Sequence, residues 1–118
     1  MTLTATESEI ILPEIVLPTD VETMSAIDIV TKIQCGDEDT WEDELRWVWV
    51  SDRHRTLNLL DRIVSDGRII EPIFIGRNYP DDRVERTGKE WRVYNGHHRT
   101  AIGLALQIPV PVSFNPNT

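Results

Sequence analysis

The run NGHHRT, at residues 95–100, has the composition of a phosphate-binding turn. It separates a predicted strand from a predicted helix, and Gly96 permits a tight turn with close approach of a ligand to the backbone. The first amides of a helix lack intrahelical partners and lie at the positive end of its dipole, where anions bind. Arg99 can hold a phosphate through two parallel hydrogen bonds, and His97 or His98 can donate a hydrogen bond or transfer a proton near neutral pH.

Two other interpretations of this run stay open. In the first, the run is a capped helix start whose histidines are solvated and bind nothing. In the second, the histidines bind zinc. Adjacent histidines are poorly placed to hold one ion, and Cys35, the only cysteine, supplies no obvious set of partners. We therefore expect no metal site built from protein ligands.

The elements around this run are predicted from the spacing of apolar residues. Trp91–Tyr94 is predicted as the strand before the turn, and His98–Leu106 as the helix after it. Pro109–Phe114 is predicted as a last strand, placed at an edge because proline cannot donate to a central ladder. Ile69–Ile75 is predicted as a buried strand, with Pro72 near its start.

An amphipathic helix is predicted over Thr56–Asp66. Its apolar stripe is formed by Leu59, Leu60, Ile63 and Val64. Gly67 is the stop signal of this helix, because glycine readily adopts the left-handed conformation at a helix C-terminus. The polar stretch Arg77–Glu90 is predicted as a long hairpin loop.

The first part of the chain is predicted as a tail followed by a strand and a helix. Residues 1–9 are predicted as the tail, and the apolar, β-branched segment Ile10–Leu17 as a short or edge strand. Ser25 is a predicted N-cap for a helix that ends at Cys35-Gly36. The apolar face of this helix is predicted to carry Ile27, Val30 and Ile33.

The middle of the chain completes the predicted fold. Asp37–Glu44 is predicted as an acidic connector, and Leu45–Val50 (LRWVWV) as a strand with Trp47 and Trp49 on one face. Core packing with one ring at the surface is the simpler role for Trp41, Trp47 and Trp49, with base stacking or partner binding as the alternative. The elements together predict an α+β fold, a small mixed sheet packed with two or three helices. Residues 10–50 are expected to pack as an extension on a core formed by residues 51–118, within one domain.

The chain of 118 residues has a net charge of −8, and the acidity is concentrated in the first 50 residues. This excess of carboxylates counts against DNA binding, which depends on cations that neutralise phosphates. Arginines dominate the bases of the second part, and Arg53 and Arg55 could help to bind phosphate. We find no stretch of apolar residues that could span a membrane and no signal peptide, and we expect a cytoplasmic location.

Two segments, SDGRIIEPIFIGR (65–77) and WRVYNGHHRTAIGLALQIPVPV (91–112), resemble the ParB/sulfiredoxin-like superfamily. The order of elements and the phase of the helices agree with that family over about half of the chain. The resemblance implies that Gly96, His97, His98, Arg99 and Thr100 bind the phosphates of a nucleotide. It implies ATP, ADP or CTP as the ligand, accompanied by Mg²⁺ where the phosphates react.

The sequence departs from individual members of that superfamily. His97 occupies the position of the catalytic cysteine of sulfiredoxins, which argues against reduction of sulfinic acids by that mechanism. The chain stops at Thr118, where partitioning ParB proteins continue into a helix-turn-helix. The turn is most similar to that of free-serine kinases, which need a catalytic carboxylate. Candidate catalytic residues are His97, Asp52 and Glu71.

The leading hypothesis is a single-domain ParB-like protein that binds a nucleotide or another phosphorylated ligand at this turn. An enzyme of this kind would catalyse phosphoryl transfer or nucleotide hydrolysis. One alternative is an inactive interaction module whose acidic N-terminal half binds a basic protein partner. A further alternative is a ParB-like DNA-binding protein or nuclease.

Overall fold

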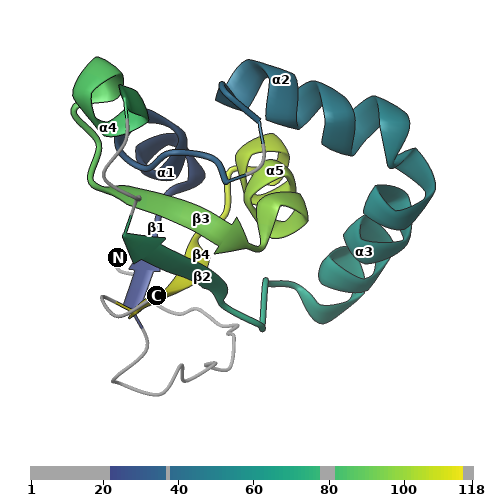
Figure 1. The fold of residues 1–118 in the computed structure, drawn as a ribbon. Coiled ribbons are helices and arrows are strands. Elements are labelled where there is room, and N and C mark those ends of the chain that lie inside the picture. Colours follow the sequence, from purple (N-terminus) through teal and green to yellow (C-terminus); the bar gives the residue numbers. More distant parts are fainter. Residues whose placement is uncertain (1–21, 37, 78–81, 116–118) are drawn as a thin grey trace.

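The structure is a computed structural model that describes residues 22–36, 38–77 and 82–115 (Figure 1). The predicted tail at residues 1–9 and the predicted strand Ile10–Leu17 lie outside the described residues. The fold is α+β, with a four-stranded mixed sheet in the order β1-β4-β2-β3. Its strands are β1 (Glu22–Met24), β2 (Ile73–Arg77), β3 (Trp91–Asn95) and β4 (Val110–Asn115). The predicted fold class is confirmed.

Strand β4 lies inside the sheet, so the predicted edge position is wrong. It pairs antiparallel with β1 on one side and parallel with β2 on the other. Pro111 lies opposite Thr23 of β1, whereas the pairing with β2 begins only at Val112, opposite Ile73. The proline is tolerated because the strand has a single partner at that point.

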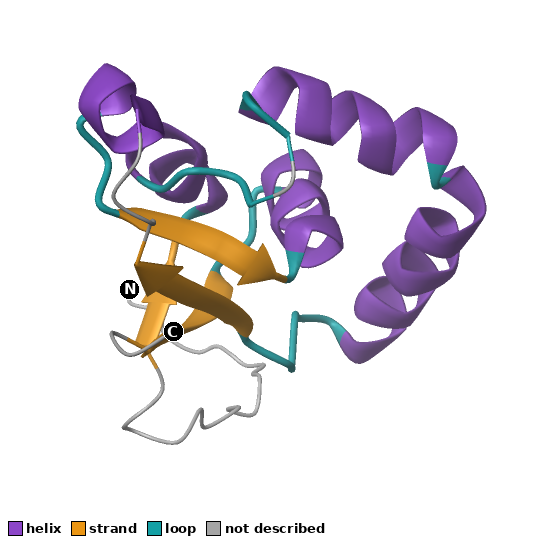
Figure 2. Cartoon of the chain, viewed as in Figure 1, coloured by secondary structure: helices purple, strands orange, loops and turns teal. Residues whose placement is uncertain are grey.

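The helices gather on one side of the sheet (Figure 2). They are α1 (Ala26–Lys32), α2 (Trp41–Arg46), the π-helix η1 (Trp47–Ser51), α3 (Arg53–Asp66), α4 (Asp82–Thr87) and α5 (His97–Leu106). The described residues therefore hold more helices than the two or three that the sequence predicts. The central helix is α5, which contacts α1, α3, β2 and β4. Its buried Ile102 joins a core formed with apolar residues of α1 and of the sheet.

The predicted strand Leu45–Val50 is wrong, because α2 and η1 form one continuous helical segment there. Half of the predicted acidic connector belongs to the same segment. The hydroxyl of Thr40 caps α2 by accepting a hydrogen bond from the Asp43 amide at 3.1 Å. Trp41, Glu44 and Val48 are buried, and this spacing of three and four residues is that of a helix face. The alternation of tryptophan and valine over residues 47–50 predicts a strand. It is too short to show the helical period, which appears only when Trp41 and Glu44 are included.

The helix α1 begins at the predicted cap, since Ser25 Oγ accepts a hydrogen bond from the Asp28 amide at 3.2 Å. It ends at Lys32, before the predicted Cys35-Gly36. Its buried face carries Ala26 and Ile29, whereas Ile27 is 58% exposed. Ile33 of the predicted apolar face is buried and Val30 packs against the core, so only Ile27 of that face is wrong.

The predicted helix over Thr56–Asp66 is confirmed as the greater part of α3, and Gly67 ends it with a φ of 78°. Ile63 of its predicted stripe is buried, but Val64 is exposed and lies off the packed face. Strand β2 starts only after Pro72, although Ile69 before it is also buried. The predicted loop Arg77–Glu90 contains the short helix α4.

Candidate functional site

The turn from β3 into α5 is built around Gly96, which has a φ of 115°. A Cβ atom at this position would lie 2.4 Å from Ile73 Cγ2, so the turn accepts only glycine. The first intrahelical bond of α5 runs from the Thr100 amide to the Gly96 carbonyl oxygen, at 3.0 Å. The amides of His97, His98 and Arg99 precede this bond and form the electropositive end of the helix.

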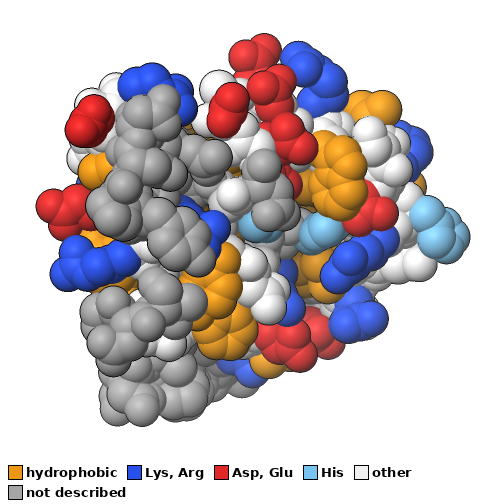
Figure 3. Space-filling view, viewed as in Figure 1, with side chains coloured by type: hydrophobic (Ala, Val, Ile, Leu, Met, Phe, Trp, Pro, Cys, Tyr) orange, Lys and Arg blue, Asp and Glu red, His pale blue; other side chains and the backbone are white. Residues whose placement is uncertain are grey.

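An open pocket of about 440 Å³ lies between this helix end and α3. It is lined by His54, Arg55, Asn58, Leu59, Arg62, Glu71, Asn95, Gly96, His98 and Arg99. Three arginines and two histidines thus face one carboxylate, that of Glu71, in a chain whose net charge is −8. Figure 3 shows blue and pale-blue side chains gathered over α3 and the adjoining end of α5. The charged side chains that line the pocket are therefore mostly cationic, and their field favours anions.

Arg99 is held in this pocket by two contacts from the segment before β2. Its Nη2 lies 2.9 Å from Glu71 Oε1, and its Nη1 donates to the Pro72 carbonyl oxygen at 3.1 Å. The Arg99 side chain is 20% exposed, whereas that of Glu71 is 73% exposed. Because Glu71 is mostly exposed, this ion pair adds little to the stability of the fold. A ligand anion can therefore displace the Glu71 carboxylate from Arg99.

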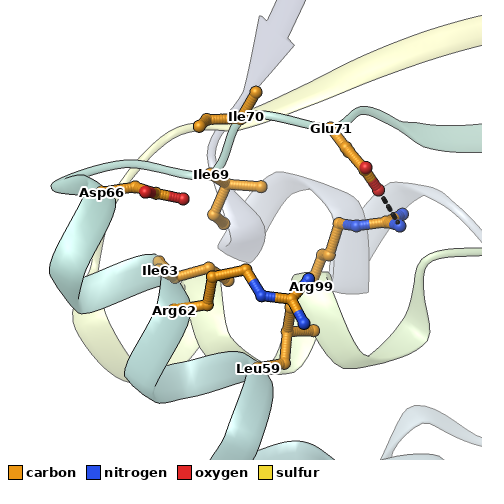
Figure 4. A pocket seen from close by; sticks show the side chains of 8 residues that line it. All are labelled: Leu59, Arg62, Ile63, Asp66, Ile69, Ile70, Glu71 and Arg99. Carbon is orange, nitrogen blue, oxygen red and sulfur yellow. Dashed lines mark hydrogen bonds and ion pairs between the residues drawn. The ribbon is translucent and has the colours of Figure 1, made fainter.

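The groove continues past Arg99 into a smaller cavity of about 190 Å³ (Figure 4). The side chains of Arg62 and Arg99 lie next to each other in this view, and Glu71 reaches toward the Arg99 guanidinium from above. Its apolar wall is formed by Leu59, Ile63, Ile69 and Ile70, with Asp66 at one end. The two cavities share Leu59, Arg62, Glu71 and Arg99, so they form one continuous surface.

His98 is oriented by Asp52, the residue between η1 and α3. His98 Nε2 lies 2.8 Å from Asp52 Oδ2, and the two side chains are 14% and 28% exposed. Trp47 contacts the imidazole ring edge-on, with 5.9 Å between the ring centroids and an angle of 71° between the planes. His98 thus enters the pocket from a fixed position, supported from the segment before α3.

His97 and Thr100 lie behind the pocket and are absent from its lining. His97 is 8% exposed, and its Nε2 accepts a hydrogen bond from the Gly36 amide at 3.0 Å. An Nε2 atom that accepts this bond carries no proton, so His97 is a neutral structural residue here. Thr100 is fully buried, and its hydroxyl donates to the Gly96 carbonyl oxygen at 3.0 Å. The structure thus brings Gly96, His98 and Arg99 of the predicted site to the pocket, while these two side chains support the turn.

The other predicted candidates divide in the same way. Glu71 lines the pocket, whereas Asp52 reaches it only through His98. Arg55 lines the pocket and Arg53 does not. Cys35 is buried, with its thiol 2.9 Å from the Glu38 carbonyl oxygen.

Sequence reasoning expected Arg53 and Arg55 of α3 near the phosphate but missed three other polar residues of that helix that line the pocket. His54, Asn58 and Arg62 are spaced by four residues and form a polar stripe on one face of that helix. The spacing was visible in the sequence. The apolar stripe of the same helix predicts only the face that packs against the core.

The described residues contain no group of three His, Cys, Asp or Glu side chains able to hold a metal ion. Among the same residues, no helix is both long enough and apolar enough to cross a membrane. Comparisons with protein-family models, with curated proteins and with solved structures find no match for this chain.

Proposed function

We propose that this protein binds a nucleotide or another phosphorylated small molecule in the pocket between α3 and α5, as a single-domain protein of the ParB/sulfiredoxin-like kind. One observation carries the proposal. An acidic chain gathers Arg55, Arg62 and Arg99 in one pocket, which adjoins the N-terminal end of α5. The volume of about 440 Å³ lies within the range of about 300–1,000 Å³ that is typical of small-molecule sites.

The contacts expected for a bound phosphate follow from this geometry. The amides at the start of α5 donate to one phosphate, in the direction that the helix dipole favours. The Arg99 guanidinium binds it bidentately once Glu71 is displaced, because carboxylate and phosphate oxygens accept the same pair of hydrogen bonds. Arg62 and Arg55 face this position from α3 and suit a second phosphate.

Phosphoryl transfer or nucleotide hydrolysis in this pocket requires a base close to the phosphates. The Asp52–His98 pair fits this role best among the predicted candidates, since His98 lines the pocket and its Nε2 atom lies 2.8 Å from the Asp52 carboxylate. His97 Nε2 is occupied by the Gly36 amide, and Glu71 faces Arg99. Mg²⁺ would arrive with the phosphates, as is usual for this ion in nucleotide sites.

The test combines thermal unfolding and calorimetric titration with ATP, ADP, CTP and inorganic tripolyphosphate, each with and without Mg²⁺. A ligand that binds the native state raises the melting temperature. We expect Arg62→Ala and Arg99→Ala to weaken binding by tenfold or more, because each removes a charge-assisted contact. Arg53→Ala is the matched control, since Arg53 lies on the same helix outside the pocket lining. Failure of every phosphate compound to bind, or equal effects of the Arg53 and Arg62 variants, would contradict the proposal.

The acidic segment supports the alternative of a protein-interaction module less well. Glu44 is buried, and Arg46 forms ion pairs with Glu42 at 3.6 Å and with Asp43 at 3.2 Å. These contacts reduce the negative charge that α2 presents to a basic partner. Salt-sensitive association without nucleotide binding would nevertheless favour that alternative over the proposed function.

A further inference from the structure

Trp47 presents a large aromatic ring to solvent beside the cationic pocket. Its residue is 42% exposed, whereas Trp41 is buried and Trp49 is packed partly against the core. An exposed tryptophan ring offers a large, flat, apolar surface on which a ligand can stack. Among the tryptophans at 41–49, Trp47 is therefore the one available for binding.

The position of this ring relates it directly to the phosphate site. Its edge contacts the imidazole of His98, with the ring centroids 5.9 Å apart, and His98 lines the pocket beside Gly96 and Arg99. One side chain thus separates the indole from the groups expected to hold phosphate. Figure 3 shows apolar surface directly next to the pale-blue and blue side chains of this region.

The backbone that carries the indole and the imidazole beside the indole are both fixed before any ligand arrives. Trp47 begins the π-helix η1, and its carbonyl oxygen accepts a hydrogen bond from the Asp52 amide at 2.9 Å. Asp52 in turn binds His98 through its carboxylate. Asp52 therefore connects the backbone of Trp47 to the imidazole ring of His98, which the indole contacts. A ring on a fixed backbone and beside a fixed neighbour loses little conformational entropy when a ligand stacks on it.

We propose that Trp47 stacks on the base of the bound nucleotide while the phosphates occupy the pocket, which makes nucleoside phosphates the ligand class. The inference rests on the proposed function. A cationic pocket alone would accept any small phosphate, but an adjacent aromatic ring adds affinity only for ligands with a flat ring of their own. Stacking tolerates all bases, so Trp47 favours nucleotides over inorganic or sugar phosphates without selecting one base.

The test compares ATP, CTP and inorganic tripolyphosphate in calorimetric titrations of wild type, Trp47→Ala and Trp47→Phe. We expect Trp47→Ala to weaken nucleotide binding about tenfold and to leave tripolyphosphate affinity unchanged. Trp47→Phe should fall between the two, because phenylalanine retains part of the stacking surface. Val50→Ala is a matched control, since Val50 is exposed on the same π-helix. Nucleotide should also quench tryptophan fluorescence in the wild type more than in Trp47→Phe.

The outcomes separate this inference from the function on which it rests. Equal nucleotide affinity in wild type and Trp47→Ala overturns the stacking role alone. A parallel loss of tripolyphosphate affinity in Trp47→Ala also overturns it, because the indole would then act only by positioning His98. Failure of the wild type to bind tripolyphosphate and both nucleotides overturns the proposed function itself.

Discussion

Asp52 Oδ2 lies 2.8 Å from His98 Nε2, although 46 residues separate the two in the sequence. The contact joins the start of α3 to the start of α5, the two helices that form the walls of the pocket. Asp52 is itself fixed, because its carbonyl oxygen accepts hydrogen bonds from the Thr56 amide at 3.1 Å and from the Thr56 hydroxyl at 3.0 Å. The distance between the pocket walls therefore depends on this pair.

Replacement of Asp52 should affect both stability and binding. We expect Asp52→Ala to lower the free energy of unfolding by about 1–2 kcal/mol, because a partly buried hydrogen bond to a charged group is lost. Binding of tripolyphosphate should weaken too, since His98 loses its orienting partner. Urea denaturation and calorimetry measure the two effects. Asp52→Asn retains an acceptor and should lose less stability, and unchanged stability in Asp52→Ala would contradict the structural role of the pair.

Replacement by alanine should mainly lower stability at His97 and mainly lower anion affinity at His98. His97→Ala should cost about 2–4 kcal/mol of unfolding free energy, because it removes a buried ring beside Trp41 and leaves the Gly36 amide without its acceptor. His98→Ala should cost less stability and more anion affinity. Chemical denaturation and titration of the two variants test this division of roles. A larger loss of affinity in His97→Ala, measured where it is still folded, would count against the division.

Gly96 and Gly67 provide a matched pair of glycines with positive φ. At Gly96 an added Cβ would lie 2.4 Å from Ile73 Cγ2, whereas at Gly67 no atom lies within 4 Å of it. Gly67→Ala should cost about 1 kcal/mol, the cost of the left-handed conformation alone. Gly96→Ala should cost more than about 3 kcal/mol, because β2 must also move. Melting temperatures of both variants test this difference, and equal losses would show that the turn adapts.

Substitution of Glu71 should tighten anion binding, in contrast to the usual effect of a change in a binding site. Glu71→Gln removes the carboxylate that competes with a ligand for Arg99. Because Glu71 is mostly exposed, we expect a gain of only about two- to fivefold in tripolyphosphate affinity. Weaker binding of the Mg²⁺–nucleotide complex in this variant would instead indicate that Glu71 contacts the metal or reacts, as the sequence alone allowed.

The sequence predicts those parts of the site whose conformation is set by residues close by in the chain. Gly96 is required by a single turn, and the strand and helix on either side of it have clear apolar periods. Gly67 likewise ends α3 through its own backbone conformation. Such features depend on neighbours in the chain, and for this reason composition and spacing are enough to locate them.

Features set by tertiary contacts were not predictable in the same way. Whether His97 or His98 faces the pocket depends on Gly36, which is 61 residues away from His97 and donates its amide to that ring. The segment LRWVWV alternates like a strand, yet Val48 is buried as part of a helix face. Strand propensity is weak where packing decides the conformation, so tertiary contacts overrode it here.

The π-helix η1 fixes the number of residues between Trp47 and Asp52. A π-turn is a helical turn with one additional residue, and each residue of an α-helix advances the side-chain direction by about 100°. Without that extra residue, the segment after Trp47 would turn by this angle, and Asp52 would no longer point at His98. The number of residues between Trp47 and Asp52 therefore determines whether Asp52 can contact His98. The exposed Val50 position accepts many side chains other than proline, but the number of residues between the indole and the carboxylate is fixed by the site.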